Sequence, residues 1–341
     1  MSEQAEPMPV VLITGFLGSG KTTLLNHLLR DPGMAQTAVI INEFGDVAID
    51  HLLVESAIEN AVVLQSGCIC CTVRGDLVDT LDDLETKVKA GDLPPFDRVA
   101  IETTGLADPA ALVHTFLTER SLQGRFALRA VVTTVDAANG AGQLDEFEEA
   151  RHQAALADVI ILTKSDLVAQ SVTAELVGRL EAMNPGAAIV PVVQGAISPD
   201  DLFARIPASP ARAVDDVLAW LNAEAFARAQ EAAASSHHDR SVQAFAVTLD
   251  RPVTREALRG WLRALLSLRG RDLLRMKGIV ALRGEPTPLV VHAVQNVLHP
   301  PVRLAAWPSE DRTTRIVFIT RNIAPAAIQS SLNMLATGEA A

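Results

Sequence analysis

The segment GFLGSGKTT, residues 15–23, constrains the fold of this chain more than any other feature. It matches the pattern GxxxxGK(S/T) and stands between the apolar run Val10–Thr14 and an amphipathic segment. A strand that turns through glycines into a helix aims backbone N–H groups and the positive end of the helix dipole at an anion. The segment therefore predicts a phosphate-binding loop between a buried strand and a helix.

Each residue type in this loop has a physical role in holding phosphate. Glycine lets the backbone turn its N–H groups inward. The Lys21 ammonium should reach the β- and γ-phosphates, and the Thr22 hydroxyl should bind Mg²⁺. The residues expected to bind nucleotide here are Gly15, Gly18, Ser19, Gly20, Lys21, Thr22 and Thr23.

Short apolar runs alternate with amphipathic segments through the first two hundred residues. The runs are rich in β-branched residues, as strands buried on both faces are. The predicted strands are Val10–Thr14, Thr37–Asn42, Val62–Gln65, Arg98–Glu102, Leu128–Val135, Val159–Thr163 and Ile189–Val193. The predicted helices are Lys21–Arg30, Leu77–Ala90, Ala110–Thr118, Gln143–Leu156 and Thr173–Met183. This alternation indicates an α/β domain with a mostly parallel sheet flanked by helices.

A smaller α+β domain is predicted after residue 240, where the charge changes sign. Residues 1–240 carry 16 basic and 34 acidic side chains, whereas residues 241–341 carry 13 and 7. Its predicted strands are Gln243–Leu249, Lys277–Leu282, Leu289–Val294 and Arg315–Thr320, and its predicted helices are Thr254–Ser267 and Pro325–Leu335. The predicted organisation is a tail (1–8), a P-loop domain (9–208), a helix at Val214–Glu231 with a linker (209–240), the second domain (241–335) and a tail (336–341).

Two later strand ends select the nucleotide. In RVAIETTG, residues 98–105, Glu102 can hold Mg²⁺ through water, and the Gly105 N–H can meet the γ-phosphate because no side chain blocks its approach. In TKSD, residues 163–166, the Asp166 carboxylate can accept both N–H groups of the guanine edge. The Lys164 stem would then lie along the purine face. Together with the phosphate loop, these motifs predict a GTP site.

The segment NEFGD, residues 42–46, follows the second predicted strand. It is interpreted as a switch that reports the nucleotide state, with Asp46 as a candidate for Mg²⁺ or for the attacking water. The alternative is an aspartate in an ordinary turn. The predicted catalytic residues are therefore Lys21, Glu102 and Asp46.

All three cysteines of the chain, Cys68, Cys70 and Cys71, lie in the segment SGCICCTV. Thiolates are soft ligands that suit Zn²⁺ and accept Co²⁺, so the cluster predicts a transition-metal site. Three thiolates leave a tetrahedral site incomplete, which suits release of the ion. Two alternatives stay open: redox chemistry at the C-x-x-C spacing of Cys68 and Cys71, and a structural zinc site.

The order GFLGSGKTTLL, NEFGDVAID, GCICC, ETTGLADP and TKSDL resembles the CobW-type metallochaperone GTPases, which are relatives of the urease and hydrogenase nickel-insertion GTPases. The resemblance implies that GTP binding and hydrolysis are coupled to delivery of zinc or cobalt from Cys68, Cys70 and Cys71. Two features depart from the family pattern. Thr163 stands where GTPases usually carry asparagine, and only His237 and His238 remain of the long histidine tract of many relatives.

Composition excludes several classes of partner. The formal net charge of −12 argues against a general nucleic-acid or anionic-membrane binder, and no apolar stretch reaches the roughly 18–20 residues of a membrane span. The N-terminus lacks the pattern of a signal peptide, so a cytoplasmic location is expected. The basic segment Arg269–Lys277 is interpreted as a contact for an acidic partner or domain, or as a solvated basic face. His114 is considered as a further metal ligand, with a core or surface role as the alternative.

The sequence thus predicts a GTP-hydrolysing metallochaperone that uses GTP, Mg²⁺ and Zn²⁺ or Co²⁺ and delivers the metal to a client metalloprotein. Water would attack the γ-phosphate, and a homodimer is considered because the motifs contain no obvious arginine finger. The alternatives are a P-loop small-molecule kinase and a non-catalytic regulator that binds GTP and metal.

Overall fold

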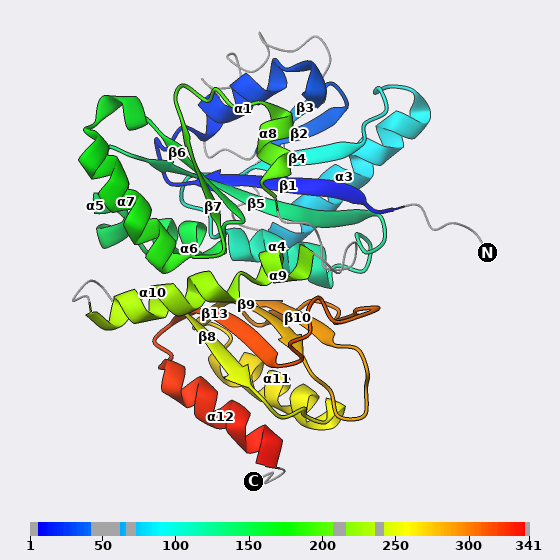
Figure 1. Cartoon of the computed structure of the whole chain (residues 1–341). Helices are drawn as coiled ribbons and strands as arrows, with labels where there is room; N and C mark the ends of the chain where they lie inside the picture. Colours follow the sequence, from blue (N-terminus) through cyan, green and yellow to red (C-terminus); the bar gives the residue numbers. More distant parts are fainter. Residues whose placement is uncertain (1–5, 42–61, 66–72, 207–215, 236–241, 338–341) are drawn as a thin grey trace. The chain divides into compact units, whose positions relative to one another are not determined.

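The computed structural model describes residues 6–41, 62–65, 73–206, 216–235 and 242–337. The chain divides into two compact units (Figure 1). The first unit comprises residues 1–176 and 188–206, and the second comprises residues 177–187 and 207–341. The sequence places the end of the first domain at residue 208 and does not predict that residues 177–187 group with the second unit.

The first unit is built on a seven-stranded sheet of order β3-β2-β4-β1-β5-β6-β7. Every neighbouring pair is parallel, which confirms the predicted fold class. Every strand predicted here is present, with ends that differ by at most two residues. The strands are β1 (Met8–Gly15), β2 (Thr37–Ile41), β3 (Val62–Gln65), β4 (Arg98–Glu102), β5 (Phe126–Asp136), β6 (Val159–Thr163) and β7 (Ala188–Val192).

Helices cover both faces of this sheet (Figure 1). On one face, Leu24, Leu25 and Leu28 of α1 pack in one core cluster with alternate strand residues such as Ile13 and Val39. The other face carries α4 and α6, which contact β5. The helices are α1 (Lys21–Leu29), η1 (Pro32–Met34), α3 (Val73–Ala90), α4 (Pro109–Thr118), α5 (Gly140–Glu146), α6 (Glu148–Leu156), η2 (Ser165–Leu167), α7 (Gln170–Met183) and α8 (Pro199–Ala204).

Two predicted helices are each broken in two, so their continuous prediction is wrong. The segment predicted at 143–156 divides into α5 and α6 at Phe147, whose backbone is extended and whose ring lies 4.6 Å from that of Phe16. The segment predicted at 214–231 divides into α9 (Asp216–Leu221) and α10 (Ala223–Ser235). Asn222 between them is left-handed (φ 48°) and donates from Nδ2 to the Pro185 carbonyl at 3.0 Å. In both cases a contact distant in sequence decides the break.

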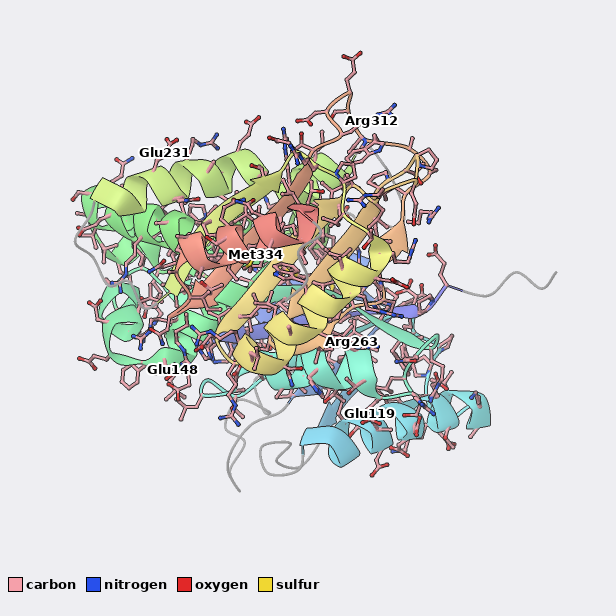
Figure 2. The ribbon with its side chains drawn as sticks, turned by 90° about the horizontal axis from the view of Figure 1, so that it is seen from below. Glu119, Glu148, Glu231, Arg263, Arg312 and Met334 are labelled. Atoms are coloured by element: carbon pink, nitrogen blue, oxygen red, sulfur yellow. The ribbon has the colours of Figure 1, made fainter. Side chains whose placement is uncertain are left out.

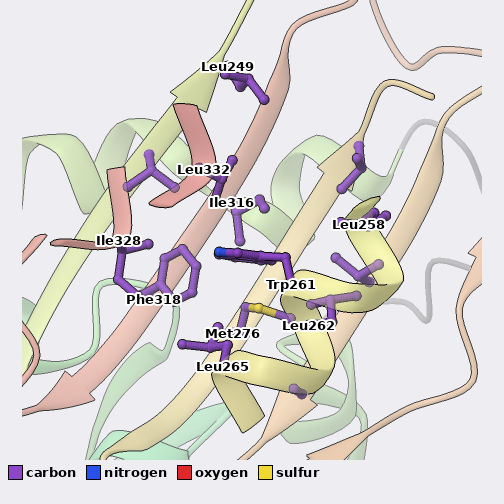
Figure 3. Close-up of a cluster of buried hydrophobic side chains, with 14 of the residues drawn as sticks. Leu249, Leu258, Trp261, Leu262, Leu265, Met276, Ile316, Phe318, Ile328 and Leu332 are labelled. Carbon is purple, nitrogen blue, oxygen red and sulfur yellow. The ribbon is translucent and has the colours of Figure 1, made fainter. Parts of the chain in front are cut away.

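The second unit is an antiparallel sheet of order β11-β10-β9-β13-β8, with β12 paired to β10. One face packs against α11 (Arg255–Arg269) and α12 (Pro325–Thr337) around Phe245, Trp261 and Phe318, and Figure 3 shows part of this core. The Trp261 indole N–H donates to Ser331 Oγ at 3.0 Å. The strands are β8 (Val242–Leu249), β9 (Leu273–Val280), β10 (Leu289–Val294), β11 (Val297–Leu298), β12 (Val302–Arg303) and β13 (Thr314–Arg321).

The predicted basic face at 269–277 is wrong for two of its residues. Strand β9 is buried along its whole length, and Arg275 and Lys277 are 7% and 3% exposed. Lys277 Nζ donates to the Trp220 carbonyl at 3.2 Å. His292 lies opposite Lys277 in the sheet, and its ring stacks on that of His299 at 4.0 Å. Burial lowers the pKa of His292 well below its ordinary value, with further lowering from His299, Arg275 and Lys277.

Candidate functional site

The predicted site residues meet at one edge of the parallel sheet. Strands β1, β4, β5 and β6 run in the same direction, so their carboxyl ends lie together. The register pairs Ile13 with Glu102, Gly15 with Thr134, and Asp136 with Thr163. Parallel sheets bind ligands at this carboxyl edge. Segments more than a hundred residues apart in sequence therefore form one site.

The phosphate loop takes a conformation that requires glycine at several positions. Gly15, Gly18 and Gly20 have φ values of 145°, 70° and 94°, a region that other residues rarely adopt. A Cβ atom on Gly15 would also fall inside contact distance of the Thr134 backbone and side chain. The Ser19 side chain is buried, and its hydroxyl lies 2.6 Å from Thr134 Oγ1. The loop is thus fixed against β5 by packing and by hydrogen bonds.

The predicted phosphate and magnesium ligands are adjacent. Lys21 Nζ donates to the carbonyl groups of Gly15 and Phe16 at 3.0 and 3.2 Å, so its ammonium lies against the loop that it should serve. Thr22 Oγ1 donates to Glu102 Oε1 at 3.0 Å. Glu102 is 5% exposed. A hydroxyl and a carboxylate at this separation are the oxygen donors that Mg²⁺ prefers beside a nucleotide, so these residues fit that ion.

Gly105 lies against the phosphate loop. A Cβ atom at this position would come within 2.8 Å of the Leu17 backbone nitrogen and 2.9 Å of its Cα. Gln153 on α6 donates from Nε2 to the carbonyl groups of Gly105 and Ala107 at 3.1 and 3.0 Å. On the sequence alone, the glycine at position 105 is attributed to the close approach of a phosphate. The structure adds a second reason, because a side chain here would collide with Leu17.

The predicted base-reading residues occupy the turn after β6. Thr163, which replaces the asparagine usual at this position, donates from Oγ1 to the Ser19 carbonyl at 2.7 Å and thereby fixes the phosphate loop. Lys164 is left-handed (φ 57°), and its Nζ donates to the Gly18 carbonyl and to Asp136 Oδ2, both at 2.8 Å. Asp166 lies in η2 and is exposed, as a residue that must contact a nucleotide base should be.

Sequence reasoning missed two residues of this edge, Asp136 and Gln153. Asp136 ends β5 as Glu102 ends β4, so a buried strand that terminates in a carboxylate was a usable signal. Burial of Asp136 disfavours its charged form, but hydrogen bonds from Lys164, Asn139 and the Ala138 N–H outweigh this effect and lower its pKa. Gln153 follows no motif, and only the packing of α6 brings it to Gly105.

Four predicted site residues lie outside the described residues: Asp46, Cys68, Cys70 and Cys71, and so do His237 and His238 of the shortened histidine tract. The flanks of the cysteine segment are described, since β3 ends at Gln65 and α3 begins at Val73. His114 on α4 is half-buried, and its Nδ1 lies 3.3 Å from Thr118 Oγ1. Within the described ranges, no group of three or more His, Cys, Asp or Glu residues could hold a metal ion. The transition-metal site therefore stays a prediction.

None of the helices that the structure describes is long and apolar enough to span a membrane.

Comparison with protein families matches both parts of the chain. Residues 9–191 match the model of the CobW/HypB/UreG nucleotide-binding domain. Residues 242–336 match the model of the C-terminal domain of the cobalamin synthesis protein cobW.

Similar proteins extend over nearly the whole chain. A zinc chaperone of Escherichia coli, YjiA, is 32% identical over 320 residues, which cover 92% of this chain and 94% of that protein. A zinc chaperone of Pseudomonas aeruginosa, CobW, is 32% identical over 378 residues and covers 97% and 94%. The crystal structure of the Zn(II)-bound YjiA GTPase of E. coli superposes with a TM-score of 0.73 at 28% identity, over 97% of this chain and 99% of that one.

Proposed function

The chain belongs to the CobW/HypB/UreG family, and from this membership and the geometry of its site we propose that it is a GTP-hydrolysing metallochaperone. It hydrolyses GTP to GDP and phosphate and couples this to delivery of a transition metal ion, zinc before cobalt, to a client protein. The observation that carries the proposal is the meeting of Lys21, the Thr22–Glu102 pair and the Lys164–Asp166 turn at one sheet edge.

The phosphate end of the site stabilises charge. Lys21 and the loop N–H groups would contact the β- and γ-phosphates, where negative charge develops during transfer to water. Thr22 and Glu102 would hold Mg²⁺, which neutralises phosphate charge when bound. The Gly105 N–H would contact the γ-phosphate and so distinguish GTP from GDP. Asp46 remains our candidate for orienting the attacking water.

The base end of the site selects guanine. Asp166 is exposed beside the left-handed Lys164, whose ammonium is held against the phosphate loop. In the proposed complex the Asp166 carboxylate accepts from the guanine N1–H and 2-amino group, and the Lys164 stem covers one face of the ring. Adenine offers neither of these donors on that edge.

The metal is cargo in this proposal, and Cys68, Cys70 and Cys71 are its ligands. The register pairs Ile41 with Gln65, so β2 and β3 end side by side. The segment with Asp46 follows β2 and the cysteine segment follows β3. Strands β2 and β3 therefore end at the sheet edge that carries Glu102, and in this proposal the nucleotide state is coupled to the metal through the segments that follow them. The names of the similar zinc chaperones support zinc as the cargo.

We also propose a homodimer that forms through the nucleotide edge. Leu17, Leu106 and Phe147 are 53%, 55% and 38% exposed there. Gly105 packs on Leu17, and the Phe147 ring lies 4.6 Å from that of Phe16, so these residues lie beside the phosphate loop. Light scattering with a non-hydrolysable GTP analogue should show the dimer, and Leu106→Asp should abolish it.

Recognition of the client falls to the second unit in this proposal. Arg259 and Arg263 lie one turn apart on the exposed side of α11, and Arg263 is labelled in Figure 2. Arginine forks bind carboxylates in fixed geometry, so this side of α11 fits an acidic segment of the client.

The proposal is tested by titrating metal in each nucleotide state. Zn²⁺ affinity, measured by competition with a chromophoric chelator, should be about 5- to 150-fold higher with Mg²⁺ and a non-hydrolysable GTP analogue than with GDP. Replacing Cys70 and Cys71 by serine should remove this difference while GTP binding in metal-free buffer stays unchanged. Equal Zn²⁺ affinities in the two states would contradict the chaperone mechanism.

Phosphate release separates the alternatives. The parent should release phosphate from GTP without any acceptor, whereas a small-molecule kinase would need one. Single-turnover hydrolysis slower than dissociation of the GTP complex would favour a non-catalytic regulator.

A further inference from the structure

We propose that Asp136 is a positioning residue for nucleotide recognition, which holds Lys164 in the place where its stem contacts the purine ring. The inference rests on the proposed GTP site, because it gives Lys164 the role assigned there. Asp136 lies at the carboxyl end of β5 and belongs to none of the motifs that identify the site.

The Asp136 carboxylate is built into the sheet edge. It is the register partner of Thr163, and the Ala137 N–H donates to the Thr163 carbonyl at 2.9 Å. The Asp136 side chain is 1% exposed, so its position is set by the fold. A charge this deeply buried is costly unless several donors satisfy it.

The Asp136 carboxylate accepts four hydrogen bonds, which offset the cost of burying its charge. Oδ1 accepts from the backbone N–H groups of Ala138 and Asn139 at 2.8 and 3.3 Å. Oδ2 accepts from Asn139 Nδ2 at 2.9 Å and from Lys164 Nζ at 2.8 Å. The turn after β5 therefore fixes the orientation of the carboxylate. In this orientation Oδ2 also accepts the hydrogen bond from the Lys164 ammonium.

Lys164 is fixed at both of its ends by these contacts. Its backbone takes the left-handed conformation, which is unfavourable for a non-glycine residue and persists only where the surrounding structure holds it. Its ammonium is shared between Asp136 and the Gly18 carbonyl of the phosphate loop. The lysine side chain is 37% exposed, so its stem remains available to a ligand while its head is held. A free lysine would lose considerable rotamer entropy on binding, and the pair removes that cost before the nucleotide arrives.

The contact between the Lys164 stem and the purine ring determines which ligands Asp136 should help to bind. A lysine stem lies on the ring face and forms no hydrogen bond with the base edge, so it does not distinguish guanine from hypoxanthine. Asp136 should therefore support binding of GTP and ITP alike. It should not support tripolyphosphate, which has no ring and engages only Lys21 and the loop.

The test compares Asp136→Asn, Lys164→Met and the double variant in the full chain. Binding of GTP and ITP is measured by titration calorimetry, and tripolyphosphate is measured by competition with GTP. Asp136→Asn should weaken GTP and ITP by about 10- to 100-fold, the loss expected for a charge-assisted hydrogen bond. Tripolyphosphate should bind as it does to the parent. The matched control is Asp79→Asn, an exposed aspartate on α3, which should change none of the three.

The double variant distinguishes positioning from a general structural role. If Asp136 acts through Lys164, the double variant binds GTP no more weakly than Lys164→Met alone. Multiplied losses, or an equal loss of tripolyphosphate, would overturn the inference. If Asp136→Asn does not fold, Asn139→Ala replaces it, because it removes one donor to Asp136 and keeps the charge. That variant should weaken GTP by about 2- to 5-fold and spare tripolyphosphate, and an unchanged GTP affinity would overturn the inference. Failure of the parent to bind GTP would instead refute the proposed function.

Discussion

The two sheets of this chain bury charged residues at different places, and the difference separates a binding site from a structural core. In the first unit, Glu102 and Asp136 end their strands, where buried backbone meets the loops that would enclose a ligand. In the second unit, Arg275 and Lys277 lie inside β9 between neighbouring strands, and Lys277 donates to the Trp220 carbonyl. A polar group at the carboxyl end of a parallel strand lies beside loops that a ligand can reach, whereas one in the middle of an antiparallel strand is enclosed by its neighbours.

Among variants at the carboxyl edge of the first sheet, Lys21→Ala should have the largest effect on GTP affinity. The variant removes the cation from the phosphate loop, and each lost charge-assisted hydrogen bond costs about 1.5–3 kcal/mol. GTP affinity should fall by at least about a hundredfold, while the chain still folds, because Lys21 is half-buried and contributes two contacts to loop carbonyls rather than to the core. Titration calorimetry and a melting curve measure the two quantities, and Lys89→Ala on the exposed face of α3 is the control. GTP binding as tight as that of the parent would refute the phosphate-loop assignment.

Asp166→Asn should have the next largest effect, at the base end of the same edge. Loss of a charged hydrogen-bonded pair costs about 2–5 kcal/mol, so GTP should bind much more weakly. Xanthosine triphosphate should gain affinity, because its 2-oxo group meets an amide donor in place of a carboxylate. Parallel titrations with GTP, XTP and ATP measure the change. Equally tight ATP binding by the parent would contradict guanine selection.

The stability of the second unit should depend on pH through His292, and GTP affinity should not depend on that residue. Because the pKa of His292 is lowered in the fold, the unfolded chain binds a proton near pH 6.5 that the folded chain does not accept. Stability is therefore fully present above the unfolded pKa and is lost as the pH falls below it, with a slope of at most about 1.4 kcal/mol per pH unit. Denaturant unfolding between pH 8 and pH 5 measures this slope.

His292→Gln tests the origin of that slope, because it removes the titrating ring from beside Lys277 and His299. The variant should unfold with a shallower dependence on pH. GTP affinity at pH 7.5 should match that of the parent. An unchanged slope would place the titration elsewhere in the chain.

Local pattern predicted much of the fold and of the site, because the phosphate loop, the strand ends and the TKSD turn each occupy a few consecutive residues. The remaining features depend on which strands become neighbours. Ser19 and Thr134 are 115 residues apart, and their hydroxyl contact exists because β5 lies beside β1. The breaks at Phe147 and Asn222 fall in sequences with helical periodicity, and distant contacts with Phe16 and Pro185 override it. The burial of Lys277 has the same kind of cause, since its neighbours in the sheet and Trp220 on α9 are distant in sequence.

The smallest effect on nucleotide binding should come from Gln153→Met. This variant tests whether α6 helps the site to distinguish GTP from GDP. Gln153 is 1% exposed, and its amide fixes the turn at Gly105 and Ala107. Methionine has a similar shape and cannot donate, so the turn loses two hydrogen bonds without a large cavity. In the proposed complex the Gly105 N–H contacts only the γ-phosphate, which GDP lacks. The preference for a non-hydrolysable GTP analogue over GDP should therefore fall by about 3- to 10-fold, and GDP affinity should stay unchanged. Gln143→Met is the matched control, since Gln143 reaches the Leu17 carbonyl only at 3.5 Å. An equal loss for both nucleotides would mean that Gln153 merely packs beneath the phosphate loop, and the edge would then read the γ-phosphate without help from α6.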